Sequence, residues 1–184
     1  MKRFTIILFF LCLWVISFAQ NISFMGIPLG TSLNDFKEKL AGKGYTYDDY
    51  ISNKGDSHDT YYFDGVFAGS VVTLSVTTTP KSKLVSAISV GFKDYTTEKE
   101  GVTESSINSK YKEIEQSLKD KYTNAKVDKW SNGSIIKATS FKGKGWGINL
   151  SIQMQSDGIY KGICLLYSDF DTFSKAEKEF EEDY

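Results

Sequence analysis

His58 is the only histidine in the 184-residue chain, and it offers the most obvious chemistry. It lies between Asp56 and Asp59 in a polar stretch, so a base and an orienting acid are close together in the sequence. A catalytic triad also needs a nucleophile, and no G-x-S-x-G elbow occurs. A zinc site needs three or four ligands, which this sparse set of histidine and cysteine does not supply. We therefore expect a solvated loop histidine, no metal and no cofactor.

Oxygen-bearing side chains crowd the same region of the sequence. They are Asp48, Asp49, Asn53, Asp56 and Asp59. Calcium prefers such ligands, but their spacing fits no EF-hand loop. Asp and Asn are also frequent in loops because they stabilise turns. We therefore favour turn formation over a calcium site.

Paired carboxylates could catalyse the hydrolysis of a glycosidic bond, and 23 acidic residues offer many pairs. Catalytic carboxylates often lie in apolar or aromatic surroundings, which raise their pKa. Asp64 is the one that follows an aromatic run, Tyr61-Tyr62-Phe63. A position at the edge of a strand also explains Asp64, so a carboxylate-dependent hydrolase remains an alternative and no catalytic residue is predicted.

The arginine and aromatic content of the chain disfavours nucleic-acid binding and favours contact with a protein or a glycan. Arg3 is the only arginine, and the formal charge is -1, so the phosphate and guanine contacts of nucleic-acid binding are not expected. Tyrosine and tryptophan are frequent, and they provide rigid contact area for a protein or a glycan. Tyr61, Trp130 and Trp146 are the candidates that flank the predicted strands.

The first nineteen residues are typical of an export signal. Lys2 and Arg3 precede an apolar run from Phe4 to Ile16, and small residues at Ser17 and Ala19 suit cleavage before Gln20. We expect a periplasmic or secreted protein with no membrane insertion after the signal is removed. Cys12 leaves with the signal, so Cys164 remains as a lone, buried thiol.

Helical and alternating patterns predict three helices and eight strands. Ser32 begins a helix that ends at Gly42, an apolar stripe runs from Ile107 to Tyr122, and Ser174 with Glu177 caps a C-terminal helix. The predicted strands span 45–51, 60–68, 71–79, 84–92, 125–130, 134–141, 147–155 and 160–168.

Period-2 alternation gives the strands one apolar and one polar face. Val72, Leu74 and Val76 share a face, as do Ile148, Leu150 and Ile152. The opposite positions are small and polar, which predicts a sheet face open to solvent. Its candidate binding residues are Thr73, Ser75, Thr77, Asn149, Ser151 and Gln153.

The order of helix and four strands occurs twice. Segment 85–95 aligns with 160–170 at an offset of 75, and Leu74-Ser75-Val76 aligns with Leu150-Ser151-Ile152 at an offset of 76. We predict an α+β fold of two tandem helix-plus-four-antiparallel-strand repeats, with the helices on one face of the sheet. The predicted parts are a signal (1–19), a first repeat (20–95), a connector (96–104), a second repeat (105–170) and a C-terminal helix (171–184).

The segment Phe24-Met25-Gly26-Ile27-Pro28-Leu29-Gly30-Thr31-Ser32, with the helix that follows, resembles small secreted Bacteroidota proteins of unknown function. The repeated layout is similar to that of the beta-lactamase-inhibitor-protein-like fold. That family begins each repeat with two helices, whereas one clear helix per repeat is predicted here, so no functional residue is carried over.

The sequence favours an exported, non-catalytic binding module that contacts a protein or a glycan through the open sheet face. The alternatives are the small carboxylate-dependent hydrolase, acting on cell-wall or glycan substrates, and a structural component of the envelope.

Overall fold

The computed structural model describes residues 22–54, 59–154 and 161–181. The predicted export segment, Asp56 and His58 lie outside these ranges, as does Cys12. Within them the chain has an α+β fold, as predicted. No helix in the described ranges is long and apolar enough to cross a membrane.

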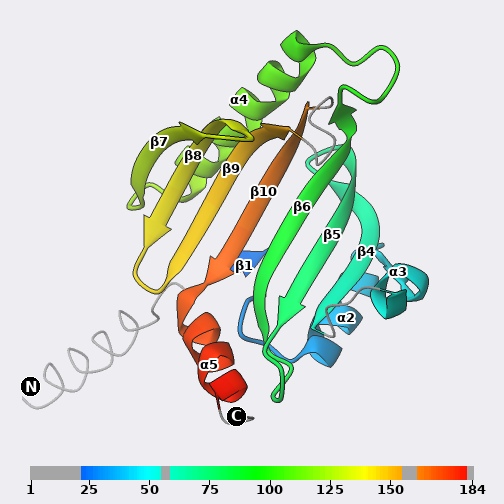
Figure 1. Ribbon diagram of the computed structural model, residues 1–184, viewed down its shortest axis with the longest axis vertical. Helices are drawn as coiled ribbons and strands as arrows, with labels where there is room; N and C mark the ends of the chain where they lie inside the picture. The colour runs from blue at the N-terminus through cyan, green and yellow to red at the C-terminus, as the bar shows by residue number, and fades with distance from the viewer. Residues whose placement is uncertain (1–21, 55–58, 155–160, 182–184) are drawn as a thin grey trace, which may run out of the picture.

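One antiparallel sheet of eight strands dominates the molecule (Figure 1). Its order is β3-β4-β5-β6-β10-β9-β8-β7. The bounds are β3 Thr46–Asp48, β4 Thr60–Phe67, β5 Ser70–Thr78, β6 Val85–Thr96, β7 Lys126–Asn132, β8 Ile135–Gly143, β9 Trp146–Met154 and β10 Lys161–Asp169. A short hairpin, which the sequence analysis did not predict, precedes the sheet and comprises β1 Ser23–Phe24 and β2 Ile27–Pro28.

The two halves of the sheet have equivalent strand orders on the two sides of the β6–β10 pair. Each half runs from its short or exposed edge strand inward, in chain order, to the strand at the centre. Val90 of β6 pairs with Leu165 of β10, and these residues are equivalent at the offset of 75 found in the sequence. Their outer partners, Leu74 and Leu150, are also equivalent. The halves therefore share strand order and register, and they form one continuous sheet.

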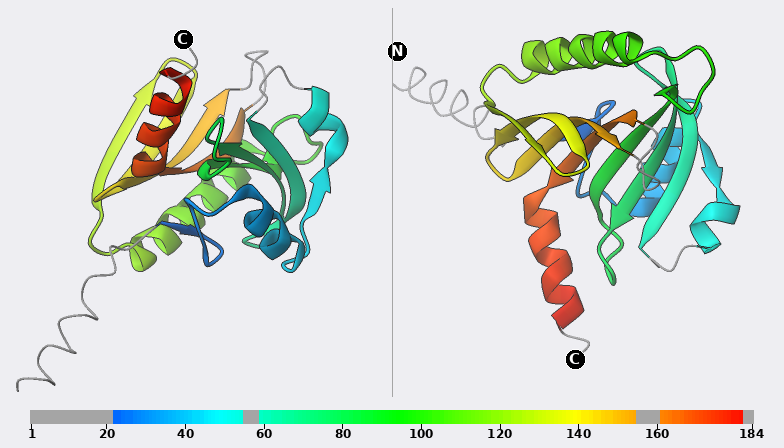
Figure 2. Two further views of the ribbon diagram at one scale, coloured as in Figure 1. Left: turned by 90° about the horizontal axis from the view of Figure 1, so that it is seen from below. Right: turned by 45° about the horizontal axis from the view of Figure 1, so that its top comes forward.

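Helices α2 (Leu33–Ala41) and α4 (Glu104–Lys121) cover the same face of the sheet, as the edge-on view in Figure 2 shows. Ser32 caps α2 by accepting a hydrogen bond from the Asp35 amide at 3.2 Å, as predicted. Both helices direct their apolar stripes onto the sheet. Phe36 and Tyr111 are completely buried in a single core that includes residues from both halves. Burial of apolar surface such as these stripes is the dominant favourable contribution to folding.

The C-terminal helix α5 (Phe170–Glu181) lies on the opposite side of the sheet from α2 and α4 (Figure 2). Its first ring, Phe170, packs over Gly147, where a Cβ atom would lie only 2.8 Å from the ring. The predicted cap at Ser174 is wrong, because the helix begins four residues earlier. Asp169 instead accepts hydrogen bonds from the amides of Asp171 and Thr172, each at 3.1 Å.

Two other predicted strands end at least three residues away from their predicted ends. The strand predicted over 45–51 is interrupted, because β3 ends at Asp48 and the short helix α3 (Asp49–Lys54) begins at once. Asp49 in the first turn favours that start, since a carboxylate stabilises a helix N-terminus. In the other case β6 continues to Thr96, beyond the predicted end at Phe92. This extension forms part of the site described next.

Candidate functional site

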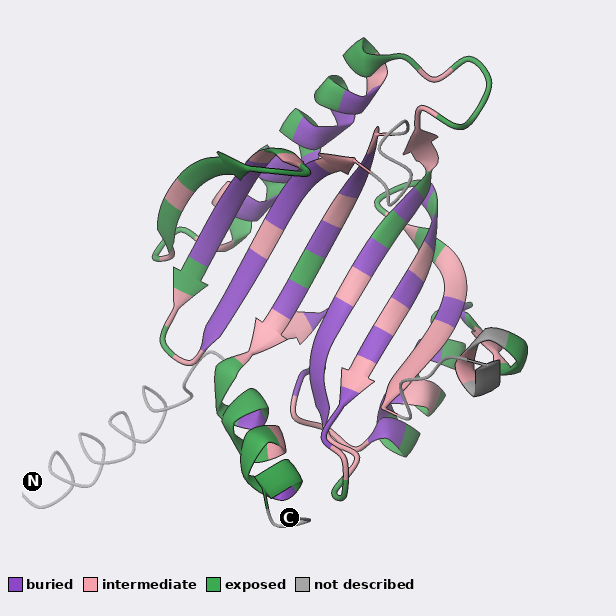
Figure 3. Ribbon diagram, viewed as in Figure 1, coloured by how far each residue is buried: buried purple, intermediate pink, exposed green. Residues whose placement is uncertain are grey.

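The sheet face that α2 and α4 leave uncovered is lined by small and polar residues. Along β5 the buried residues alternate with half-buried threonines and serines, and β6 alternates between buried and more exposed residues from Ile88 to Lys93 (Figure 3). Pairing places Thr73 beside Gly91, and Gly91 beside Cys164, all with their side-chain positions on this face. We call it the open face. Its small side chains leave room above the centre of the sheet.

The pairing between the two central strands, β6 and β10, is interrupted beside the open face. Gly91 pairs with Cys164, and the next pair in the register is Thr96 with Gly162. Four residues of β6 therefore stand opposite a single residue of β10, Ile163. Bulges of this kind bend a strand and are frequent beside binding and catalytic sites. Here the bulge lies at the junction of the two halves.

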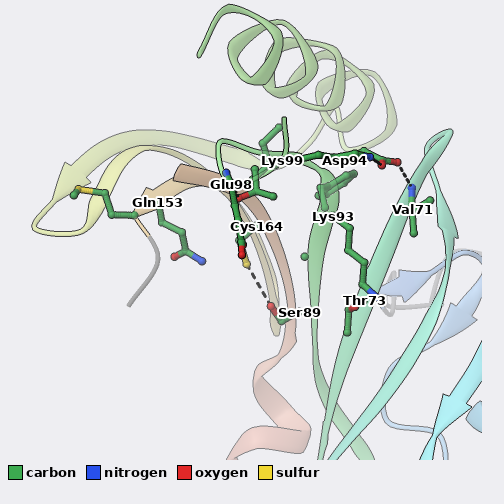
Figure 4. Close-up of a pocket in the computed structure, with 15 residues that line it drawn as sticks. Val71, Thr73, Ser89, Lys93, Asp94, Glu98, Lys99, Gln153 and Cys164 are labelled. Atoms are coloured by element: carbon green, nitrogen blue, oxygen red, sulfur yellow. Dashed lines mark hydrogen bonds and ion pairs between the residues drawn. The ribbon is translucent and has the colours of Figure 1, made fainter. Parts of the chain in front are cut away.

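A hollow of about 860 Å³ lies at this bulge, and the close-up in Figure 4 shows its labelled side chains. Strands β5, β6, β9 and β10 and the turn after β6 all contribute to it. The lining residues are Val71, Thr73, Ser89, Gly91, Phe92, Lys93, Asp94, Thr96, Glu98, Lys99, Gln153, Met154, Gly162, Ile163 and Cys164. The size is that of a pocket for a small molecule or for a few residues of a polymer.

The floor of the hollow is polar and uncharged. Ser89 Oγ and Cys164 Sγ are 3.3 Å apart and share a hydrogen bond across the junction of the halves (Figure 4). These two residues are equivalent at the offset of 75, so the contact lies where the halves meet. Ser151 donates to the carbonyl of Cys164 at 3.4 Å. Hydroxyl, thiol and amide groups can exchange hydrogen bonds with a ligand here without bringing a charge.

Burial raises the pKa of Cys164, and hydrogen bonds from Ser89 and Gln153 only partly oppose that effect. The predicted buried, unreactive thiol is thus half-buried and lines the hollow, with its proton retained at neutral pH.

Two ion pairs form one wall of the hollow. Lys93 contacts Asp64 at 2.8 Å, and Thr73 donates to the same carboxylate at 2.7 Å. Partial burial pushes the pKa of Asp64 up, but the hydrogen bonds from Lys93 and Thr73 outweigh it, and the pKa is lowered. Asp64 is therefore an ion-paired carboxylate in the structure, unlike the raised-pKa acid that hydrolysis requires.

The second pair joins Asp94 to Lys99 in the turn that follows β6. Asp94 also accepts a hydrogen bond from the Val71 amide at 2.8 Å (Figure 4). The hydrogen bond from Lys99 is the main cause of the lowered pKa of Asp94. Asp94 thus fastens β5 and the turn to the bulged part of β6, and it fixes the shape of the hollow.

The predicted binding residues fall into three groups. Thr73 and Gln153 line the hollow. Ser75, Thr77, Asn149 and Ser151 lie on the same open face but outside the lining, as their positions in the strand registers require. Trp130 is also on the open face, in edge strand β7, where its Nε1–H donates to Ser140 Oγ at 2.8 Å.

Tyr61 and Trp146 were predicted to flank the open face, and the structure places both on the helix-covered face. Tyr61 pairs with Val76, whose side chain lies in the core, and it packs against that core. Trp146 is 7% exposed and packs on Tyr122, with ring centroids 5.1 Å apart. Both residues lie out of phase with the open-face positions of their strands, since a shift of one position moves a side chain to the other face.

Sequence reasoning missed most of the residues that form the hollow. Ser89 and Gly91 had a usable signal, because small residues recur in phase on β6 and on its equivalent strand. Lys93, Asp94 and Glu98 had none, since the bulge that brings them to the hollow depends on pairing between strands far apart in sequence.

Searches against protein-family models, curated proteins and solved structures found no match to this chain.

Proposed function

We propose that this protein is an exported, non-catalytic binding module whose open sheet face contacts a protein or a glycan, with the hollow at the β6–β10 junction as the centre of the contact. The observation that carries the proposal is this hollow of about 860 Å³, lined by groups from both halves. It offers polar groups at its floor and apolar ones, such as Val71 and Met154, beside them. That combination is typical of binding pockets.

The carboxylates of the described residues, in the hollow and elsewhere, support binding without catalysis. Glycoside hydrolysis needs a carboxyl group whose pKa is raised so that it can donate a proton at neutral pH. Each described carboxylate with a resolved shift has a lowered pKa: Asp64, Asp94, Glu115 and Glu179. These are the properties of ion-paired, structural carboxylates. The alternative of a structural envelope component gains less support, because it does not call for a hollow of this size.

The test compares one variant that fills the hollow with a matched variant on the opposite side of the molecule. Gly91 lines the hollow, and a Cβ atom there would meet only the Thr73 carbonyl oxygen, at 3.8 Å. Gly91→Leu should therefore fold normally while its side chain occupies the space of the ligand. Ser117→Leu places the same side chain on the exposed side of α4, which covers the opposite face of the sheet.

Fluorescently labelled protein, lacking residues 1–19, is applied to an array of oligosaccharides that includes peptidoglycan fragments and to an array of random peptides. We expect wild type and Ser117→Leu to bind the same features, and Gly91→Leu to bind them at least tenfold more weakly, a loss of about 1.4 kcal/mol. The proposal is wrong if neither array is bound, or if Gly91→Leu binds as wild type does.

A further inference from the structure

The bulge leaves a run of main-chain groups outside the sheet ladders. Lys93, Asp94 and Tyr95 follow the last β6 residue that pairs with β5, Phe92, and precede Thr96, which pairs with β10. The register gives these three residues no facing residue on either neighbouring strand. Main-chain groups released from a ladder are those that an added strand segment can bond.

Glycines permit another backbone to come close to this segment. Gly91 and Gly162 lie beside the two ends of the interrupted ladder, and both line the hollow. With no side chain at either position, a bound chain can lie near the strands themselves. Glycine within a strand often marks such a close approach. The hollow therefore suits a ligand that is recognised through its own main chain.

Among the described residues, the lining offers no platform for a sugar ring. Phe92 is the one aromatic residue in the described part of the lining, and it is 3% exposed because its side chain lies in the core. Trp130 stands on β7, at the far edge of the second half, and does not line the hollow. Binding of an oligosaccharide commonly uses an exposed aromatic face, so the geometry favours a peptide.

The charge of the hollow's wall indicates which kind of peptide would bind there. Lys93 and Lys99 are each paired with an aspartate. Glu98 also lines the hollow, and among the described residues it forms no ion pair. The lining and its partners thus leave one uncompensated negative charge, which a lysine or arginine of a ligand would neutralise.

We propose that the hollow binds an extended, basic peptide segment of a partner protein, with main-chain hydrogen bonds to β6 at residues 93–95 and a cationic side chain against Glu98. This inference rests on the proposed function and narrows its ligand to one class of polymer. Alternate side chains of the segment would point into the hollow beside Val71 and Met154.

The test begins with a decapeptide library selected on the wild-type protein lacking residues 1–19. The selected peptides should carry a lysine or arginine, and Glu98→Gln should weaken their binding about fivefold or more, measured by fluorescence anisotropy. Glu100→Gln, in the same turn but outside the lining, is the control and should have no effect. A fivefold loss corresponds to about 1 kcal/mol, which the loss of a charge-assisted hydrogen bond can account for.

Main-chain recognition is tested by N-methylation of a selected peptide at alternate residues, in two versions of opposite phase. At least one version should bind tenfold or more weakly, because each lost main-chain bond costs about fivefold. Bound peptide should also slow the alkylation of Cys164, which lines the same hollow.

The outcomes separate the two proposals. If oligosaccharides protect Cys164 and peptides do not, the hollow is a binding site but the peptide class is wrong. Binding that tolerates both N-methylated versions, or that is indifferent to Glu98→Gln, also overturns the peptide proposal. Failure of every peptide and oligosaccharide to protect Cys164 overturns the proposed function itself.

Discussion

Single residues in this protein hold charges in places where they stabilise the fold, and Glu115 of α4 is the clearest case. Its carboxylate accepts a hydrogen bond from Thr139 at 2.9 Å and pairs with Lys129 at 3.0 Å and Lys119 at 3.4 Å. Because Thr139 donates its one hydroxyl proton to Glu115, Tyr111 is the donor in the 2.8 Å bond between Tyr111 and Thr139. The network ties α4 to β7 and β8 beneath the sheet.

Removal of this carboxylate should destabilise the protein in a pH-dependent way. Burial raises the pKa of Glu115, but hydrogen bonds from Lys129 and Thr139 outweigh it, and the folded pKa lies below the ordinary 4.5. The stabilisation is therefore complete above pH 4.5 and declines as the pH falls below it. We expect Glu115→Ala to lower the free energy of unfolding by about 2 kcal/mol at pH 7, measured with urea.

The same comparison at pH 3 should give a smaller difference between wild type and Glu115→Ala. Glu38→Ala removes an exposed carboxylate from α2 and should change stability little at either pH. A difference that is equally large at pH 7 and pH 3 would contradict the assignment of a lowered pKa to Glu115.

Cys164 provides a second prediction at this scale. Because burial raises its pKa, the folded protein should hold little thiolate at pH 8, and access to the sulfur is also restricted. We expect iodoacetamide to alkylate the thiol at least tenfold more slowly in the folded protein than in 8 M urea. Equal rates in the two states would show that the thiol is neither buried nor protonated as the structure places it.

Among the elements, α5 is anchored near its C-terminal end by one carboxylate, that of Glu179. The Glu179 carboxylate accepts hydrogen bonds from the amides of Lys81 and Ser82, at 2.9 and 3.1 Å, and from Ser82 Oγ at 2.5 Å. This contact joins the end of α5 to the turn between β5 and β6. The same bonds, that from the Ser82 hydroxyl foremost, lower the pKa of Glu179 to about 2.

Glu179→Gln should loosen α5 without unfolding the sheet. The neutral amide accepts weaker hydrogen bonds than the carboxylate, so hydrogen exchange of the α5 amides should become several-fold faster at pH 7. In wild type the contact should be complete above pH 4.5 and weaken as the pH falls toward 2, because the folded pKa is lowered. Glu177→Gln, on the same helix, is the control, and an equal effect of both variants would contradict the anchor.

The elements also show which features of the fold local sequence predicts and which it does not. Strands with strict alternation, such as β5 and β9, were predicted with the correct face because burial on one side dictates their pattern. The end of β6 and the start of α5 were not predicted correctly. Thr96 and Phe170 adopt their strand and helix conformations through contacts with residues far away in sequence. The hollow depends on those same long-range contacts. Its floor could be anticipated from small residues in phase, but its charged wall could not.

The molecule as a whole joins two similar halves through the pairing of β6 with β10. Phe36 of α2 and Tyr111 of α4 belong to one continuous core beneath this junction. A half on its own would expose the edge of its inner strand and part of that core. We therefore expect the halves to unfold together in one cooperative transition, although their sequences repeat.

A core substitution in the first half tests this expectation with reporters in the second. Trp130 and Trp146 lie in β7 and β9, whereas Phe36 is fully buried under the first half. Phe36→Ala should cost about 3 kcal/mol, and with a slope of about 2 kcal/mol/M it should lower the urea midpoint of tryptophan fluorescence by roughly 1.5 M. Val66→Ala, at a side chain 60% exposed, should leave that midpoint unchanged. Independent halves would instead keep the tryptophan transition of Phe36→Ala at the wild-type midpoint, because the loss would then be confined to the first half.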